Sequence, residues 1–223
     1  VLITGVLGQD GSILEEKYRN SGHKVLGVTS PSSRNSMIND SISKSNLSDF
    51  SQLANLFSEF RPDRIFHLAA KARIQPSFKQ PVEYFETNTN GTLNIAQYCV
   101  NNGIPLVYAG SSSHHSGKFK NPYTFSKDIG EEIIKLYQDH FKLNASITRF
   151  YNVYGPHHLR DGGYSTVIGR WEKQYDDGEP LTIYGDGSKR RDFTHIDDIV
   201  NGLIKIHEKE AWGYIFELGR GEN

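Results

Sequence analysis

Apolar and polar positions alternate in blocks along the first 154 residues. Five short blocks are apolar at successive positions, which is typical of strands buried on both faces of a parallel sheet, and they cover residues 1–4, 24–29, 64–70, 106–111 and 145–153. The segments between them carry apolar residues at helical spacing, and we expect helices at 12–20, 49–60, 81–101 and 122–140. This order predicts an α/β fold with a doubly wound, Rossmann-type parallel sheet.

The pattern changes after residue 155. We expect, in order, a helix, two strands, a helix and a strand at 166–175, 181–184, 191–195, 197–207 and 214–218. We place a domain boundary here, so that residues 1–160 form a dinucleotide-binding domain and residues 161–223 form part of a smaller C-terminal substrate-binding lobe. The chain begins without Met inside a strand and stops just after one, so we expect a fragment whose lobe is truncated. The serine-rich stretch 30–45 is predicted to be a surface loop.

Composition excludes several classes of protein. The 25 Lys and Arg residues balance 26 Asp and Glu residues, and a net charge of −1 argues against binding of nucleic acid or an anionic membrane. Cys99 is the single cysteine, which excludes a disulfide framework and a multi-cysteine metal site. The sequence has no run of about 18 apolar residues and no signal-peptide pattern, so we expect a cytoplasmic protein.

A glycine motif lies between the first strand and the first helix. Gly5, Gly8 and Gly11, with Gln9 and Asp10 among them, allow a tight turn and a close approach of the backbone to a pyrophosphate at a helix N-terminus. The alternative is a glycine turn that joins strand and helix without a ligand. Because the motif follows the first of five alternating units, we expect it to bind a dinucleotide.

The end of the second strand bears on the choice of dinucleotide. It carries no carboxylate that would accept the ribose 2′-hydroxyl of NAD. Ser30 and Arg34 follow instead, and they could hold a 2′-phosphate, although a plain surface loop would have the same residues. We expect NAD(P) as cofactor, with NADP slightly favoured over NAD.

Tyr123 and Lys127 are the candidate proton-transfer pair. They lie one helical turn apart, so their side chains share a face, and they open the helix that follows the fourth strand. A lysine ammonium together with an oxidised nicotinamide lowers the pKa of a tyrosine, which would make Tyr123 a general base. The serines 111–113 end the fourth strand, where a hydroxyl could orient the reacting oxygen or simply cap a turn. The alternative without a catalytic function is a surface tyrosine beside a solvated lysine.

Several motifs together resemble one known family. TGVLGQDG at 4–11, HLAA at 67–70, the serines ahead of Tyr123 and Lys127, RFYNVYGP at 149–156 and YGDGSKRRDFTHIDD at 184–198 are similar to the extended short-chain dehydrogenase/reductases. Within these, the chain resembles the NAD(P)-dependent nucleotide-sugar epimerases and dehydratases. The likeness runs in order through nearly all of the chain.

The resemblance implies roles for individual residues. Ser112, Tyr123 and Lys127 would be catalytic, and Lys127 would also hold the nicotinamide ribose. Besides the glycine motif, Ser30 and Arg34, the cofactor would contact Asn46, Leu47, Leu68, Ala69, Ala70, Tyr123, Lys127, Tyr151 and Val153. Substrate would contact Ser112, Asn152 and Arg191, and the arginine would pair with a sugar-nucleotide diphosphate. The family also implies a homodimer through the helices at 81–101 and 122–140.

Departures from the family pattern favour one reaction. Dehydratases and decarboxylases usually carry acidic residues just after the catalytic hydroxyl, where this chain has Ser113 and His114, although His114 or His115 could substitute as an acid. Tyr123 also follows Ser112 by only 11 positions, which is shorter than usual. We therefore expect a nucleotide-sugar 4-epimerase. A 4,6-dehydratase or 4-keto reductase, and a non-catalytic dinucleotide sensor or scaffold, are the alternatives.

The nine histidines do not predict a metal site. His114 and His115 are adjacent, as are His157 and His158, and adjacent side chains in extended chain point to opposite faces. No cysteine or His-Glu-x-x-His spacing accompanies them, so we expect no metal.

Overall fold

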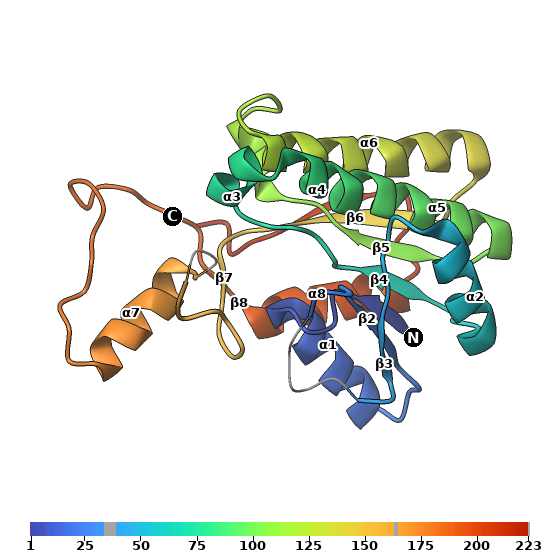
Figure 1. Ribbon diagram of the computed structural model, residues 1–223, viewed down its shortest axis with the longest axis horizontal. Coiled ribbons are helices and arrows are strands. Elements are labelled where there is room, and N and C mark those ends of the chain that lie inside the picture. The colour runs from blue at the N-terminus through green and yellow to red at the C-terminus, as the bar shows by residue number, and fades with distance from the viewer. Residues whose placement is uncertain (34–38, 163–164, 223) are drawn as a thin grey trace.

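A seven-stranded parallel sheet forms the centre of the molecule (Figure 1). The computed structural model describes residues 1–33, 39–162 and 165–222. The strand order is β3-β2-β1-β4-β5-β6-β9. The strands are β1 (Leu2–Thr4), β2 (Leu26–Thr29), β3 (Ile42–Lys44), β4 (Ile65–His67), β5 (Leu106–Ala109), β6 (Ala145–Phe150) and β9 (Ile215–Leu218). This order confirms the predicted doubly wound fold, with the change of direction between β1 and β4.

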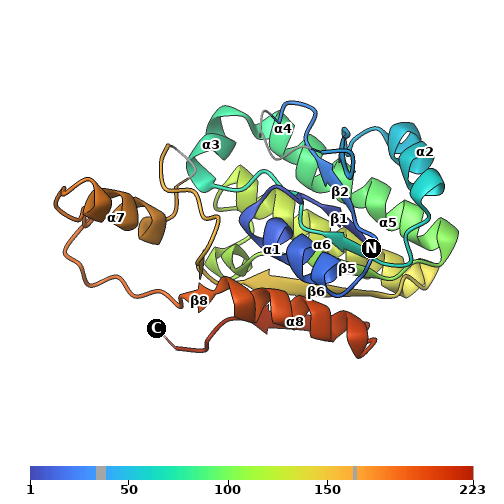
Figure 2. The same cartoon turned by 90° about the horizontal axis from the view of Figure 1, so that it is seen from below.

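Helices cover both faces of the sheet (Figures 1 and 2). One face carries α2 (Phe50–Phe60), α3 (Ile74–Lys79), α4 (Pro81–Phe85), α5 (Gly91–Asn102) and α6 (Pro122–Phe141), and the other carries α1 (Gln9–Asn20) and α8 (Ile196–Glu208). Leu53, Phe57 and Ile134 are fully buried on the first side. Phe66 and Leu203 are fully buried on the second. Burial on both faces explains why the strands are apolar at successive positions.

The helix expected from Pro81 to about residue 101 has a wider turn in its middle. It consists of α4, a π-helical turn η1 (Glu86–Asn90) and α5, and it ends at Gly103 with a φ of 65°. Such turns are frequent at functional sites. Here the turn contains Asn88, which is 1% exposed.

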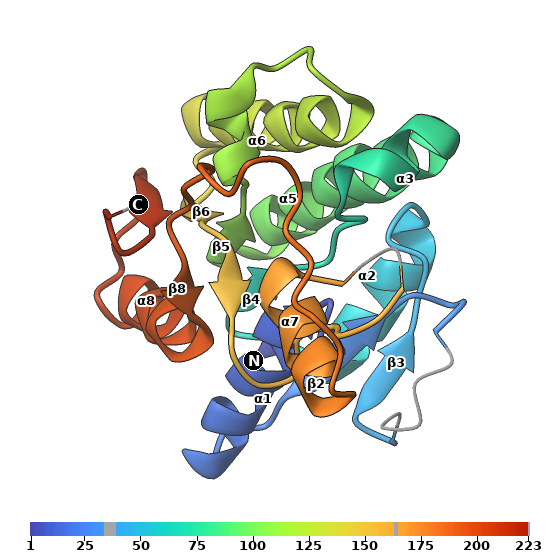
Figure 3. The same cartoon turned by 90° about the vertical axis from the view of Figure 1, so that its left-hand side faces the viewer.

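The C-terminal part of the chain differs from the expectation. β9 pairs with β6 and α8 packs beside α1, so 196–218 belong to the sheet domain rather than to a separate lobe. The assignment of all of 161–223 to a second lobe is therefore wrong for these residues. The short strands β7 (Val153–Tyr154) and β8 (Thr194–His195) pair with each other. The helix α7 (Val167–Asp176) projects away from the sheet (Figure 1), so it lies in front of the sheet when this side faces the viewer (Figure 3).

Two short elements were not predicted, and one predicted strand does not form. β3 lies inside the stretch 30–45, where Ile42 is its only buried residue, and α3 is a six-residue helix with Pro76 in its first turn. Neither has enough periodic apolar positions to be seen in the sequence. The segment 181–184 has no strand partner. Its backbone instead contacts α7, where Trp171 Nε1 donates to the Thr182 carbonyl over 2.8 Å.

The described part of the chain contains no helix that is both long and apolar enough to cross a membrane.

A glycine on α6 sets how closely this helix approaches the sheet, and this gives a stability prediction. A Cβ at Gly130 would lie 2.1 Å from the Tyr108 hydroxyl oxygen and 3.0 Å from its Cζ. We expect Gly130→Ala to destabilise the fold by about 1–3 kcal/mol, despite the helix propensity of alanine. In a Tyr108→Phe background, Gly130→Ala should lower the free energy of unfolding by less. Urea unfolding of the wild type, the two single variants and the double variant measures this difference. An unchanged or increased stability of Gly130→Ala would contradict this close contact.

Candidate active site

The glycine motif forms a tight turn at the switch point between β1 and β4. Gly5 has a φ of 75°, and a Cβ there would lie 2.8 Å from Cα of Ala69. A Cβ at Gly11 would lie 2.3 Å from the Gly5 carbonyl oxygen. Gly8 precedes α1 without a side-chain cap, so no side chain covers the free N–H groups of the first turn. This cradle of backbone donors fits the pyrophosphate of a dinucleotide.

Two side chains of the motif, Gln9 and Asp10, differ in their hydrogen bonding. Gln9 Nε2 donates to the Gly155 carbonyl over 3.3 Å and so connects α1 to the segment after β7. Asp10 Oδ1 is buried and accepts no hydrogen bond from the described residues. Burial raises the pKa of Asp10 to about 6, and the guanidinium of Arg73 opposes this shift.

The start of α6 fixes the proton-transfer pair. Asn121 Oδ1 accepts the Thr124 N–H over 2.8 Å, and Pro122 fills the first helical position, so Tyr123 lies in the first turn. Lys127 follows one turn later and is 3% exposed. As expected from their spacing, both residues lie beside the end of β5.

Lys127 is held below the end of β5 by two contacts. Its Nζ donates to the Ala109 carbonyl over 2.5 Å and lies 4.4 Å from the centroid of the Tyr108 ring. Burial lowers the pKa of Lys127 to about 8, and the negative charge of Glu131 opposes this shift. Near neutral pH the group is therefore mostly a buried ammonium.

The hydroxyl beside that of the tyrosine belongs to Ser111. The residue predicted to be catalytic is Ser112, and its role stays a prediction. Ser111 Oγ lies 3.2 Å from the Tyr123 hydroxyl and donates to Ser113 Oγ over 2.9 Å. Ser111 is extended, with a φ of −155°, whereas Ser112 already begins the 3₁₀ turn η2 (Ser112–Ser116). Within the described residues no hydrogen bond joins Ser112 to Tyr123. Three serines in a row do not show which one ends the strand.

The pKa of Tyr123 is raised in the protein alone, whereas the expected lowering concerns the complex with an oxidised nicotinamide. Burial raises it, and the Ser111 hydrogen bond and the charge of Arg73 only partly oppose this effect. The expected lowering required Lys127 together with an oxidised nicotinamide, and in the protein alone Lys127 is engaged by Ala109. The pair is thus in place, but the protein by itself favours the neutral phenol.

Two further residues support the site: Asn88, which the family resemblance implies near an active-site water, and Arg73, which the sequence motifs did not indicate. Asn88 binds the backbone of Lys71 through both ends of its amide and donates to Ser126 Oγ over 3.0 Å, so it joins η1 to α6. Arg73 has a φ of 106°, which is rare for a side chain with Cβ. Its carbonyl accepts from the Tyr84 hydroxyl over 3.0 Å. No sequence pattern marks this strained backbone.

Several of the residues expected to contact the cofactor lie near the glycine turn, where the parallel strands end. Leu68, Ala69 and Ala70 follow β4 directly and are half-buried beside the glycine turn. Leu47 is 7% exposed, and Asn46 is exposed with its side chain bound to the Ser48 N–H. Their contacts with a cofactor stay predictions.

The expected adenine-ribose loop is described only in part. Ser30 follows β2 on the surface and bonds to Ser32 over 2.9 Å. Arg34 lies outside the described residues.

The remaining predicted residues lie just after β6, at the start of β7 and just before β8. Tyr151 donates to Glu217 over 2.9 Å, Asn152 donates to the Asp192 carbonyl over 2.8 Å, and Val153 pairs with Thr194 in the small sheet. Arg191 is exposed and donates to the Arg190 carbonyl over 2.7 Å. No hydrogen bond or ion pair in the described chain joins it to Tyr123, Ser111 or Lys127, so its diphosphate role stays a prediction.

Asp10 gives a pH-dependent stability prediction. Because its pKa is raised in the folded protein from 3.8 to about 6, ionisation opposes folding, and this penalty grows as the pH rises from about 4 to about 6. We expect Asp10→Asn to be more stable than the wild type at pH 7.5, by at most about 3 kcal/mol. At pH 4 the difference should nearly vanish. Urea unfolding at both pH values, with the exposed Asp139→Asn as control, measures it, and a pH-independent difference would contradict the account.

Comparisons with known proteins agree with this geometry. The chain matches the NAD dependent epimerase/dehydratase family over residues 1–219. It is 30% identical to a UDP-glucuronate 4-epimerase of Thermodesulfobacterium geofontis, over 100% of this chain and 75% of the relative. It is 29% identical to a dTDP-D-glucose 4,6-dehydratase of Dictyostelium discoideum, over 98% of this chain and 58% of the relative.

A solved structure shows the same fold. The UDP-glucose 4-epimerase of Thermus thermophilus in complex with NAD superposes with a TM-score of 0.86 at 26% identity, over 99% of this chain and 78% of that one. The glycine turn, the Tyr-Lys pair on α6 and the match along the whole chain lead to one conclusion: this protein belongs to the NAD dependent epimerase/dehydratase family.

Proposed function

We propose that this protein is a nucleotide-sugar 4-epimerase that works through a transient 4-keto sugar and hydride exchange with bound NAD(P). The observation that carries the proposal is the contact of Ser111 with Tyr123 beside the buried Lys127, without a carboxylate in the turn that follows the serine. Ser111, Tyr123 and Lys127 together can remove and return a hydroxyl proton. They do not include the additional acid and base that an elimination of water requires.

The protein groups divide the proton chemistry among them. The Tyr123 oxygen takes the proton of the sugar C4 hydroxyl, and Ser111 Oγ holds the reacting oxygen in place beside it. The ammonium of Lys127 favours the phenolate that is needed before proton transfer. A bound NAD(P) supplies the hydride acceptor for C4 and afterwards the donor. Once the 4-keto sugar has rotated in the site, Tyr123 returns the proton to the C4 oxygen, and the cycle would have no net redox change because the cofactor would give back the hydride to the other face of C4.

The turn η2 supports epimerisation over dehydration. With Ser111 as the hydroxyl beside Tyr123, the next two positions are Ser112 and Ser113, and neither is a carboxylic acid. The two imidazole groups that could substitute each have one ring nitrogen beside a carboxylate: His114 Nδ1 lies 2.9 Å from Asp128 Oδ1, and His115 Nε2 lies 3.0 Å from Glu217 Oε1. A dehydratase needs an acid for the departing C6 hydroxyl and a base for the C5 proton.

The fate of a sugar substrate tests the proposal. Purified protein with bound dinucleotide should convert a UDP- or GDP-hexose into its 4-epimer, observed by NMR, without consuming cofactor. Tyr123→Phe should lower kcat by roughly 10²–10⁴-fold while dinucleotide binding is retained. Ser111→Ala should lower kcat roughly tenfold or more, and the neighbouring Ser112→Ala much less.

Other outcomes identify the alternatives. A 4-keto-6-deoxy product that absorbs in alkali indicates a dehydratase, and stoichiometric consumption of NADPH indicates a 4-keto reductase. An unchanged substrate panel with firmly bound dinucleotide indicates a sensor or scaffold. A larger loss in Ser112→Ala than in Ser111→Ala would contradict the role of Ser111.

Cofactor choice is a second prediction of the same proposal. We expect NADP to bind slightly more tightly than NAD, because β2 ends in Thr29 and is followed by Ser30 rather than by a carboxylate. Ser30→Asp should reverse this order, since a carboxylate repels a 2′-phosphate and accepts the 2′-hydroxyl of NAD. Calorimetric titration of both proteins with both dinucleotides measures it. Tight NAD and weak NADP binding by the wild type would overturn the preference.

The homodimer and the cytoplasmic location expected from the sequence stay predictions.

A further inference from the structure

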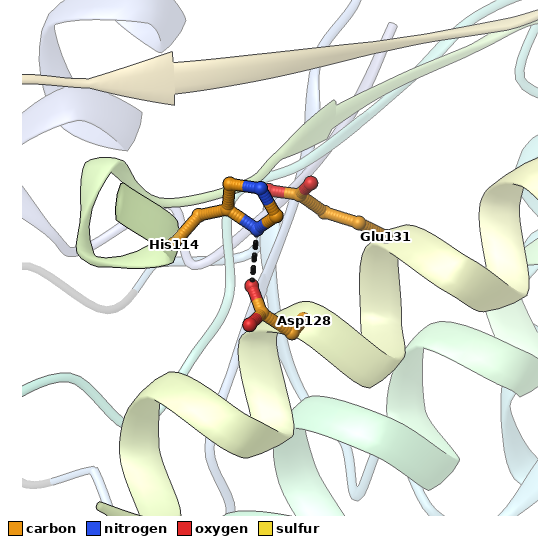
Figure 4. A group of neighbouring side chains, drawn as sticks. All are labelled: His114, Asp128 and Glu131. Atoms are coloured by element: carbon orange, nitrogen blue, oxygen red, sulfur yellow. Dashed lines mark hydrogen bonds and ion pairs between the residues drawn. The ribbon is translucent and has the colours of Figure 1, made fainter. Parts of the chain in front are cut away.

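Three potential metal ligands meet between the turn η2 and the helix α6 (Figure 4). Asp128 and Glu131 are one helical turn apart on α6, and His114 comes from η2. One ligand atom from each of the three lies within 4.8 Å of the others, and His114 Nδ1 is 2.9 Å from Asp128 Oδ1.

The two carboxylates are buried, and one of them is incompletely satisfied. The side chains of Asp128 and Glu131 are 5% and 2% exposed. Asp128 Oδ2 is buried and has no hydrogen-bond partner among the described residues. A buried carboxylate oxygen without a partner is costly, so the Asp128 carboxylate, which turns Oδ1 toward His114 (Figure 4), gains from a proton or a cation.

The site is also accessible and partly rigid. A cavity of about 130 Å³ is lined by His114, Lys118, Asp128, Glu131, Glu132 and Lys135, which leaves room for water on an ion. His114 is 41% exposed and forms the open side. Glu131 is held in place by two-pronged hydrogen bonds from Arg149, at 3.0 Å from Nε to Oε1 and 2.6 Å from Nη2 to Oε2.

The neighbouring cations are divided unequally between the two carboxylates. Arg149 pairs with Glu131, the ammonium of Lys127 also interacts with Glu131, and Lys118 is already paired with Glu132. This leaves Asp128 with His114, whose imidazole is neutral unless it is protonated, and with the exposed Lys135 at the rim of the cavity. A divalent ion would therefore meet two buried carboxylates, one of them without a fixed cationic partner.

We propose that His114, Asp128 and Glu131 bind a Zn²⁺ ion that links η2 to α6. Imidazole and carboxylate ligands suit zinc, and three protein ligands plus water complete its tetrahedral coordination. Ligand atoms around a tetrahedral zinc at about 2.0–2.1 Å lie roughly 3.4 Å apart. On zinc binding, the 2.9 Å distance between His114 Nδ1 and Asp128 Oδ1 would increase slightly, and longer distances between ligand atoms, up to 4.8 Å, would decrease. The imidazole proton would move from Nδ1 to Nε2.

The proposal changes the sequence-based expectation of no metal. That expectation compared only adjacent histidines, whereas the ligands here come from one histidine and from two acids on another element. Their distance along the chain, from position 114 to 128 and 131, follows no simple zinc-binding motif.

Zinc titration of the metal-free protein tests the site. We expect the wild type to bind one equivalent of Zn²⁺ in competition with a chromophoric chelator and to show a higher Tm in its presence. His114→Ala and Asp128→Asn should each weaken binding roughly tenfold or more, because each removes a ligand. His140→Ala, which removes an exposed histidine from the same helix, should bind as the wild type does. Mg²⁺ at equal concentration should not raise Tm, because it prefers oxygen ligands.

Each other outcome contradicts the proposal. If the wild type binds no zinc, Lys135 or a proton satisfies Asp128 instead. If binding persists unchanged in both His114→Ala and Asp128→Asn, zinc binds elsewhere, and equal effects of Mg²⁺ would contradict the role of the imidazole. Circular dichroism checks folding, and if Asp128→Asn does not fold, His114→Ala decides alone because its side chain lies on the open side of the site.

Discussion

The buried ammonium of Lys127 is the interaction on which the site depends. A charge at 3% exposure is tolerated only because Ala109, at the end of β5, accepts its hydrogen bond, because the Tyr108 ring lies under it, and because Glu131 is near. These contacts fix the rotation of α6 about its axis. Tyr123, one turn earlier on the same face, is thereby placed beside Ser111.

A buried ion pair holds the other end of this arrangement. Glu131 is bound by Arg149 of β6, and Arg149 also donates to Glu217 of β9 over 2.9 Å. Removing one partner of such a pair typically costs about 3–5 kcal/mol, because the other charge stays buried. The strands β5, β6 and β9 and the helix α6 are therefore tied together just behind the proton-transfer pair, and the preorganisation of the site is a property of the sheet.

Much of this could be predicted from the sequence. The apolar strands, the glycine turn and the spacing of Tyr123 and Lys127 are local patterns, and the structure brings the turn and the pair to the same edge of the sheet. Which of Ser111, Ser112 and Ser113 lies beside Tyr123 could not be predicted, because it depends on where β5 ends, within one residue. The packing of α8 and β9 on the sheet was not predicted for another reason. β9 pairs with β6, which is far away in the sequence, and the polar and apolar pattern of residues 196–218 is the same for an edge strand as for part of a separate lobe. The strained backbone of Arg73 and the pairing of His114 with Asp128 are likewise tertiary facts that no local pattern encodes.

The most direct test of the account is a crystal structure of the protein with a dinucleotide and a nucleotide sugar. The account predicts that the Tyr123 hydroxyl and Ser111 Oγ both hydrogen-bond the sugar C4 oxygen, with C4 of the sugar facing C4 of the nicotinamide and Lys127 on the ribose. A sugar whose C4 oxygen is separated from the Tyr123 ring by more than the width of a water molecule, in a closed complex, would contradict it.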